Sequence, residues 1–144
     1  MKNKKALVFI TVCSLIILAF FIYFTQEDRD RKAFSHSICQ NLLDSNKIFD
    51  KSVCHISQNV PDVMNSMFPV GKVDIDYVQE GLRGFKQTRY SSGVVSTPHY
   101  PQCSPGDGWE GLQYRIIRKP LILWDELYEF VFCEGILVNS TWSE

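Results

Sequence analysis

A run of apolar residues near the N-terminus constrains this chain more than any other part of its sequence. Residues 6–24, ALVFITVCSLIILAFFIYF, are 19 residues without a charge, a proline or a glycine. At about 1.5 Å per residue, a helix of this length covers roughly 28 Å, close to the ~30 Å hydrocarbon core of a bilayer. The run therefore predicts a single membrane-spanning helix, which makes the lipid bilayer the first expected partner.

The charges on either side of this run predict its orientation. Three lysines precede it, at positions 2, 4 and 5, and a mixed cluster of acids and bases follows it at 27–32. Positive charge is retained on the cytoplasmic side, so we expect the N-terminus inside and the C-terminus outside the inner (plasma) membrane. The predicted segments are a cytoplasmic tail (1–5), a transmembrane anchor (6–24), a stalk helix (25–46) and an extracytoplasmic α+β domain (47–144).

Two other N-terminal signals compete with an uncleaved anchor. A cleaved signal peptide has an apolar core of about 7–15 residues and a small-x-small cleavage site. Here the core is longer, and residues 18–21, Leu-Ala-Phe-Phe, offer no small pair. Lipid attachment at Cys13 would need a small residue where Val12 stands. We expect the anchor, and both the anchor and the signal peptide place residues 25–144 outside the cytoplasm.

The composition predicts a folded domain that does not bind nucleic acid. Without the first three lysines, 12 basic residues remain against 16 acidic ones, a net charge near −4. DNA, RNA and anionic lipid surfaces are bound by an excess of positive charge, so none is an expected partner. Ten Phe, six Tyr and three Trp supply enough aromatic area for a packed core.

The cysteines predict two disulfides. Outside the apolar run lie Cys39, Cys54, Cys103 and Cys133, an even number in an oxidising compartment. Proximity favours Cys39 with Cys54 and Cys103 with Cys133, and the two other connectivities remain open. A bridge across about 15 residues contributes roughly 3 kcal/mol of stability in the chain-entropy treatment.

The spacing of apolar residues predicts helices in the first half of the domain. Phe34, Ile38 and Leu42 recur every four residues and continue the membrane helix into the stalk. A second helix is expected over 60–68, with a proline near its first position. A third is expected over 74–83, although the same segment would also suit a strand.

The last third of the chain predicts an antiparallel sheet. Segments rich in β-branched and aromatic residues are 112–117, 121–124, 127–133 and 136–141. Only Glu134-Gly135 separates the last two, the length of a tight hairpin. A further strand is expected over 85–90 and a loop over 91–111. The predicted fold class is α+β: an N-terminal transmembrane helix, then two or three helices packed on a small antiparallel β-sheet, stapled by disulfides.

This order of elements resembles a known family. A helix, the segment Phe68-Pro69-Val70-Gly71, a helix with Val78 and Leu82, and strands ending in 128–137, YEFVFCEGIL, follow one another. Over residues 57–142 this is similar to the SmpA/OmlA-like small bacterial envelope proteins. The resemblance implies two helices followed by an antiparallel sheet, in a protein of the envelope.

Two features depart from that family. Its members have a small hydroxyl residue shortly after the Gly, where this chain has Lys72-Val73. They are usually lipid-anchored at the N-terminus, whereas this chain is predicted to span the membrane. A role in outer-membrane barrel assembly is therefore not carried over.

Clusters that could carry chemistry each have a plainer structural explanation. His36, Cys39, Cys54 and His55 could form a metal site, but adjacent Cys and His ligands would strain a tetrahedral arrangement. A Cys–His nucleophile pair would need a free thiol of low pKa, and four paired cysteines leave none. We therefore expect no metal, no cofactor and no catalytic residue, in a protein that is not an enzyme.

Three further motifs are expected to be structural. Asp74, Asp76 and Glu80 follow a turn, where a helix cap is more common than a cation site. The run 106–111, GDGWEG, lacks the following helix of a phosphate cradle, and Trp109 over a pocket is the alternative to a plain loop. The glycosylation pattern Asn139-Ser140-Thr141 is expected to be a strand end.

The expected docking site is an exposed strand edge or the surroundings of Trp109 and Trp124, because an unpaired edge can accept a strand from another chain. The predicted function is a membrane-anchored periplasmic domain that binds an envelope protein or assists envelope assembly, without catalysis. The alternative is a ligand- or lipid-binding domain with a cavity between helices and sheet. A Cys–His enzyme is a more remote alternative.

Overall fold

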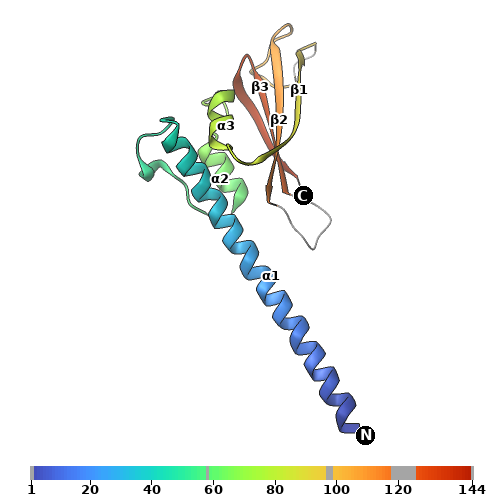
Figure 1. Cartoon of the computed structure of the whole chain (residues 1–144). Coiled ribbons are helices and arrows are strands. Elements are labelled where there is room, and N and C mark those ends of the chain that lie inside the picture. The colour runs from blue at the N-terminus through green and yellow to red at the C-terminus, as the bar shows by residue number, and fades with distance from the viewer. Residues whose placement is uncertain (1, 58, 97–98, 118–125, 144) are drawn as a thin grey trace.

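The computed structural model of this chain describes residues 2–57, 59–96, 99–117 and 126–143. A long helix, α1 (Lys2–Asp44), is followed by a 3-10 turn (Lys51–Val53) and by two small helices, α2 (Val60–Met67) and α3 (Ile75–Gly81). The strands are β1 (Lys86–Val94), β2 (Gly108–Ile117), β3 (Glu126–Cys133) and β4 (Ile136–Ser143). Figure 1 shows the N-terminal half of α1 extending away from the domain that the other elements form. The predicted α+β fold class is confirmed.

The two halves of α1 have different surroundings. The first half is long and apolar enough to span a membrane, and its most apolar stretch is not buried against the rest of the chain. In the second half, Phe34, Ile38 and Leu42 are buried in the core of the domain. The four-residue spacing of these residues therefore marks the face of the helix that packs. From Phe34 onward the segment expected as a stalk is part of the domain, and the helix ends at Asp44.

Polar contacts fix α1 to the domain at two levels. Arg31 donates from Nη2 to Oε1 of Glu126, a fully buried residue at the start of β3, at 2.6 Å. Further along the helix, the Asn41 side-chain amide donates to the carbonyls of Gly81 and Arg83 at 3.0 and 2.8 Å. The helix is therefore bonded to the sheet at one level and to the end of α3 at the other.

Both small helices begin at side-chain caps, of which the sequence predicts the one at the start of α3. The Asn59 side chain accepts the N–H of Asp62 at the start of α2, and Pro61 follows directly. Asp74 accepts the N–H of Tyr77 at 2.7 Å and begins α3. The segment 74–83 therefore forms the expected helix and not the strand that the same residues would also suit.

The sheet is antiparallel with the strand order β1-β2-β3-β4. Two expectations about its first half are wrong. The strand expected to end at residue 90 continues to Val94, and β2 begins at Gly108, inside the run expected as a loop. The added segments pair with each other residue by residue, and this pairing outweighs the low strand propensity of their Ser and Gly residues. The expected strand 121–124 lies outside the described residues.

The hairpin between β3 and β4 is confirmed. Its two turn residues, Glu134 and Gly135, have positive φ angles of 49° and 77°. Two successive positive φ angles are the requirement of the two-residue turn whose twist matches that of the flanking strands.

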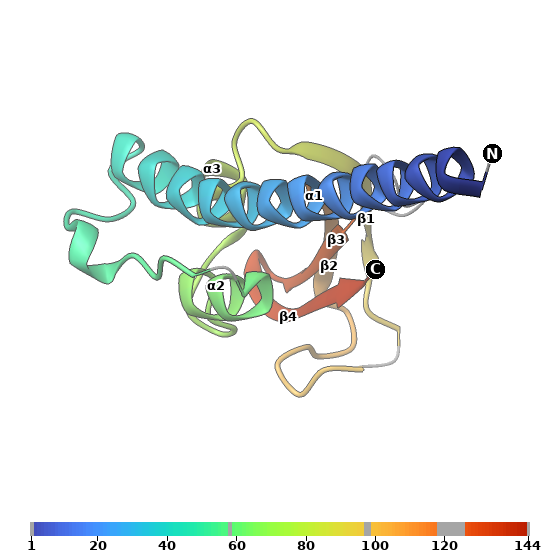
Figure 2. The ribbon, with the colours of Figure 1, turned by 90° about the horizontal axis from the view of Figure 1, so that it is seen from below.

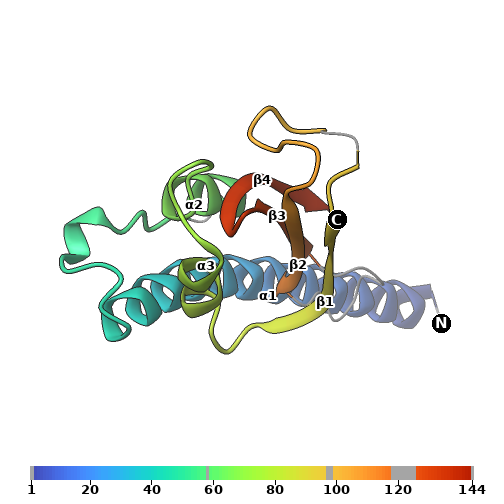
Figure 3. The ribbon, with the colours of Figure 1, turned by 90° about the horizontal axis from the view of Figure 1, so that it is seen from above.

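The sheet is covered on both faces, as the alternation in β3 predicts. Tyr128, Phe130 and Phe132 face the helices and belong to the main core. Val131 and Cys133 face the other way and pack in a second, smaller cluster. Figures 2 and 3 show the helices on one side of the strands and the loop between β1 and β2 on the other.

The two disulfides have the connectivity that proximity favours. Cys39 pairs with Cys54, 15 residues on, and Cys103 pairs with Cys133, 30 residues on. The first bridge ties the segment after α1 back to the helix, and the second ties the β1–β2 loop to β3. Cys13, on the apolar half of α1, is the free cysteine.

The sheet extends away from the apolar half of α1. Arg31, which meets the start of β3, comes seven residues after the apolar run, about 10 Å along the helix. From Glu126, β3 extends for seven residues, about 23 Å, to Cys133. We call the far end of the sheet the distal end (top of Figure 1). It is marked by Val94, Gly108, Cys133 and Ile136.

Candidate functional site

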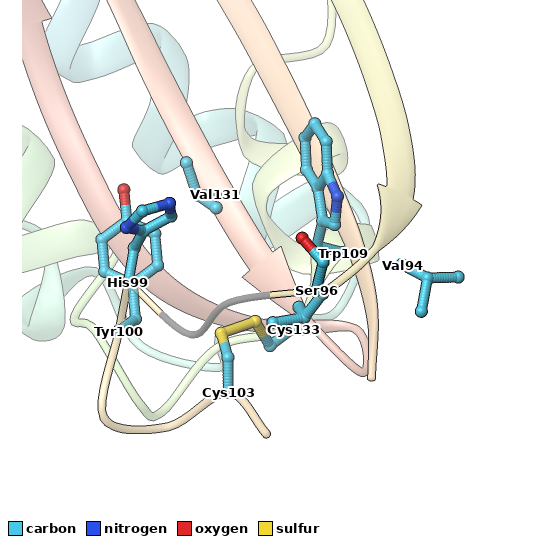
Figure 4. A pocket seen from close by; sticks show the side chains of 9 residues that line it. Val94, Ser96, His99, Tyr100, Cys103, Trp109, Val131 and Cys133 are labelled. Atoms are coloured by element: carbon cyan, nitrogen blue, oxygen red, sulfur yellow. A yellow bond between two sulfur atoms is a disulfide. The ribbon is translucent and has the colours of Figure 1, made fainter. Parts of the chain in front are cut away.

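An open pocket of about 350 Å³ lies on the outer face of the sheet at the distal end, opposite the helices. We call it the Trp109 pocket, and Figure 4 shows its side chains. The sheet contributes Trp109, Val131 and Cys133, and the loop after β1 contributes Val95, His99, Tyr100 and Cys103, which is bonded to Cys133.

The floor of the pocket follows from strand alternation. Trp109 on β2 lies opposite Cys133 on β3, and Val131 comes two residues before Cys133. Side chains two residues apart, or directly paired, emerge on one face of a sheet. Phe132, between them, points into the main core instead. The floor is therefore the outer side of strands whose inner side packs in the main core.

Two glycines set the position of the Trp109 ring. Gly93 lies opposite Trp109 on β1, and a Cβ at Gly93 would come within 2.7 Å of the indole Nε1. A Cβ at Gly111, next on the same face of β2, would lie 3.5 Å from Cζ3. Because neither residue has a side chain, the indole can lie flat across the β1–β2 pair.

The loop that forms the opposite wall is held at three points. At its base, the Val95 N–H donates to the Asp107 carbonyl at 2.8 Å. In its middle, the Asn139 amide donates to the Tyr100 hydroxyl at 3.3 Å. Near its end, Cys103 is bonded to Cys133 in the floor. Loop and sheet therefore cannot separate without breaking a covalent bond, and the pocket is preformed.

The lining suits a neutral, apolar group. Its polar groups are the Ser96 hydroxyl, the His99 imidazole and the Tyr100 phenol, and no Asp, Glu, Lys or Arg is among the described residues that line it. Ligand sites span roughly 300–1,000 Å³ with a few well-placed polar groups, so this pocket is at the small end of that range. Its size matches one or two large side chains.

The other predicted clusters lie elsewhere and are structural. The Cys39–Cys54 disulfide takes both thiols of the metal site considered from the sequence, and His36 and His55 are exposed. No three His, Cys, Asp or Glu residues within the described ranges are placed to hold a metal ion. Asp74 serves as the cap of α3.

Of the two tryptophans predicted for docking, Trp109 lines the pocket and Trp124 lies outside the described residues. The pocket is on the face of the sheet opposite the helices, so it differs from the cavity between helices and sheet that the ligand-binding alternative requires. The glycosylation pattern at 139–141 lies within β4, where the Asn139 amide is already bound to Tyr100.

The sequence did not indicate the Arg31–Glu126 pair. Its members are 95 residues apart, and no local pattern connects them. A signal was nonetheless present: Glu126 has the same strand parity as Tyr128 and Phe130, which face the core. An acid at an inward-facing position needs a buried partner, and a basic residue of the packed helix is the natural one.

Comparison with protein families, with curated proteins and with solved structures finds no match for this chain. The helices followed by a small antiparallel sheet agree with the arrangement that the SmpA/OmlA resemblance implies.

Proposed function

We propose that this chain is a single-pass membrane protein whose domain binds another protein of the envelope at the Trp109 pocket, without catalysis. The N-terminus lies in the cytoplasm, the apolar half of α1 crosses the inner (plasma) membrane, and the domain lies in the periplasm. The observation that carries this proposal is the preformed apolar pocket at the distal end, the part of the domain farthest from the anchor.

The membrane placement is supported by the surface of α1. Phe9, Phe20 and Phe21 are 70%, 61% and 67% exposed, so the domain leaves this apolar surface uncovered. Contact with water would be unfavourable for such a continuous apolar surface, whereas lipid accommodates it. The lysines before the span support a cytoplasmic N-terminus, and two disulfides support an oxidising compartment for the domain.

A protein partner is favoured over a small molecule by the openness and small size of the pocket. Protein interfaces concentrate their binding energy in a few aromatic and arginine anchors that fill well-packed pockets. A single bulky side chain of a partner would fill this pocket between Trp109 and Tyr100, while the partner surface covers its open side. The resemblance to small envelope proteins supports an envelope component as that partner.

A small apolar ligand is the second candidate, supported by the covalently braced walls. A preformed pocket costs no ordering when a ligand enters. The two candidates differ in what accompanies the purified chain, a protein or a small molecule.

The test is crosslinking of the full-length chain in its native membrane, with Trp109→Ala compared with Trp142→Ala. Trp142 is partly exposed at the end of β4 that lies away from the pocket, and it serves as the matched control. We expect the crosslinked complex to decrease at least tenfold in Trp109→Ala, because losing a central aromatic anchor costs about 2 kcal/mol or more. Trp142→Ala should retain it. A complex unchanged by Trp109→Ala contradicts the proposal, and a small molecule lost with Trp109 supports the second candidate.

A further inference from the structure

The strand β1 is an open edge of the sheet. Eight of its nine residues are exposed, and within the described part of the chain it pairs with β2 alone. The other edge is closed at the same level. There the Gly71 N–H donates to the Leu137 carbonyl at 2.8 Å, and the Leu137 N–H donates to the Val73 carbonyl at 2.9 Å. The chain thus covers one edge of the distal end with its own backbone and leaves the other edge uncovered.

The two halves of β1 differ in how they resist pairing. The half nearer the anchor contains Lys86 and Arg89 and a register shift between Gln87 and Arg89. Charges and bulges are the usual devices that prevent another strand from adding to an edge. The distal half, 90–94 (YSSGV), carries no charge and keeps a regular register. Only the distal half is therefore suited to strand addition.

The direction of the backbone groups in this half follows from hydrogen bonds at its distal end. Val95 bonds toward the β2 side through both its N–H and its carbonyl, with Asp107 and Gly106, at 2.8 Å each. Gly108, opposite Val94, instead accepts from the Glu134 N–H on its other side at 2.9 Å. Backbone groups alternate in direction along an antiparallel strand.

It follows that the N–H and carbonyl groups of Tyr90, Ser92 and Val94 point away from β2, toward the open edge. An extended chain placed beside them would find three evenly spaced donor–acceptor pairs.

We infer that an extended segment of a different envelope protein adds to the sheet as a fifth strand along residues 90–94. This inference rests on the proposed function and names the class of partner. The segment is uncharged over about five residues and places an apolar side chain above Gly93, against the indole edge of Trp109. Beyond the distal half, Lys86 and Arg89 oppose most strands, so an added segment that extends past Tyr90 needs an acidic residue to face them.

A second copy of this chain in the same membrane does not fit the edge. The strand runs away from the anchor in every copy, so antiparallel pairing of two copies would direct their anchors oppositely. In parallel pairing, a residue whose groups face the partner lies opposite one whose groups face away. Two identical edges in symmetric register would place Ser92 opposite Ser92, which breaks this rule.

The inference is tested with the full-length chain in its native membrane, carrying photoreactive benzoylphenylalanine at Tyr90, at Val94 or at Tyr100. Tyr90 and Val94 report on the edge, Tyr100 reports on the Trp109 pocket, and the same probe at Val70, on the covered side, is the control. Adducts are digested and the attachment points are mapped on the partner. In a paired strand, each residue opposes one residue, so the points reached from Tyr90 and Val94 should lie about four residues apart in one segment.

The proline variant Ser92→Pro, compared with Ser92→Ala, gives a second readout. It removes an outward N–H while leaving the β1–β2 pairing groups in place, so adduct yield from Val94 should fall about fivefold or more. Formation of the Cys103–Cys133 disulfide verifies that the variant folds, and if it does not, the spacing of the attachment points decides alone.

The outcomes separate the inference from the proposed function. Attachment points four residues apart in one foreign segment support both. Adducts from Tyr100 without adducts from the edge, or edge adducts scattered over a folded partner, overturn strand addition and leave the proposed function standing. An adduct of two copies of this chain overturns the choice of partner. Absence of adducts from all three positions overturns both proposals.

Discussion

At Gly81, near the end of α3, the helix approaches Phe68 so closely that no side chain fits. A Cβ on Gly81 would lie 2.8 Å from Cε1 and Cζ of Phe68 and 3.3 Å from a Leu42 methyl group. All three residues are buried in the main core. This glycine is the last residue of α3 and lies at the contact between α3, α2 and α1.

We predict that Gly81→Ala destabilises the domain by about 1–3 kcal/mol, because the rings around it must shift from their packed positions. The free energy of unfolding is measured by urea titration of the full-length chain in detergent micelles. Gln79→Ala, at an exposed position of the same helix, is the control and should be neutral or slightly stabilising. A stabilised Gly81→Ala would show that helix propensity outweighs the close contact.

Two core tyrosines make stability depend on alkaline pH. Burial raises the pKa of the Tyr114 and Tyr128 phenols above the ordinary value of 10.0. In the unfolded chain these phenols ionise near their ordinary pKa, so above that pH the unfolded state loses protons first. Their contribution to stability is complete below about pH 10 and decreases as the pH rises through the higher folded pKa.

We therefore expect Tyr128→Phe to lose less stability than the wild type between about pH 9 and pH 11. The measurement is urea unfolding across this range, kept short to preserve the disulfides. Tyr90→Phe, at an exposed position, should follow the wild type. If the stability of Tyr128→Phe and of the wild type fell equally with pH, other groups would cause the loss of stability at alkaline pH.

Among the elements, α1 and β3 are joined by a buried ion pair at the base of the sheet. Removing Arg31 takes a close partner from the buried Glu126 carboxylate, whereas replacing both members of such a pair with apolar groups is often close to neutral. We predict that Arg31→Met destabilises the domain by about 3 kcal/mol, and that adding Glu126→Met recovers most of the loss. Urea unfolding of the two single variants and the double variant gives the coupling energy. Additive losses would show that the pair does not act as a unit.

Which elements could be predicted depended on the range of the interactions that form them. The helix of Phe34, Ile38 and Leu42, the start of α2 near a proline, the cap of α3 and the Glu134-Gly135 hairpin follow from neighbours within a turn or two, so the sequence indicates them. The distal half of β1 is centred on Ser-Ser-Gly, which forms a strand only because β2 is there to pair with it. The sequence offered a pocket at Trp109 only as the alternative to a plain loop, because the opposite wall depends on a disulfide between cysteines 30 residues apart.

At the scale of the whole molecule, the structure predicts which end of the sheet lies near lipid. Trp142 pairs with Tyr128 and Trp109 pairs with Cys133, five residues further along β3, so Trp142 is about 16 Å nearer the anchor. In bilayers with a nitroxide quencher on the lipid headgroup, a chain retaining only Trp142 should be quenched more strongly than one retaining only Trp109. The two chains are W109F/W124F and W124F/W142F. Equal or reversed quenching would contradict the upright placement of the domain.

In the proposed placement, one helix is both the membrane span and a part of the folded core, and this shared use has a mechanical consequence. Because α1 continues from the span into the domain as one helix, the domain tilts together with the span. A thinner bilayer inclines a span of fixed length more steeply. In the proposed placement, the distal end then moves toward the bilayer and sideways together, so the thickness of the surrounding lipid sets the height of the Trp109 pocket above the membrane.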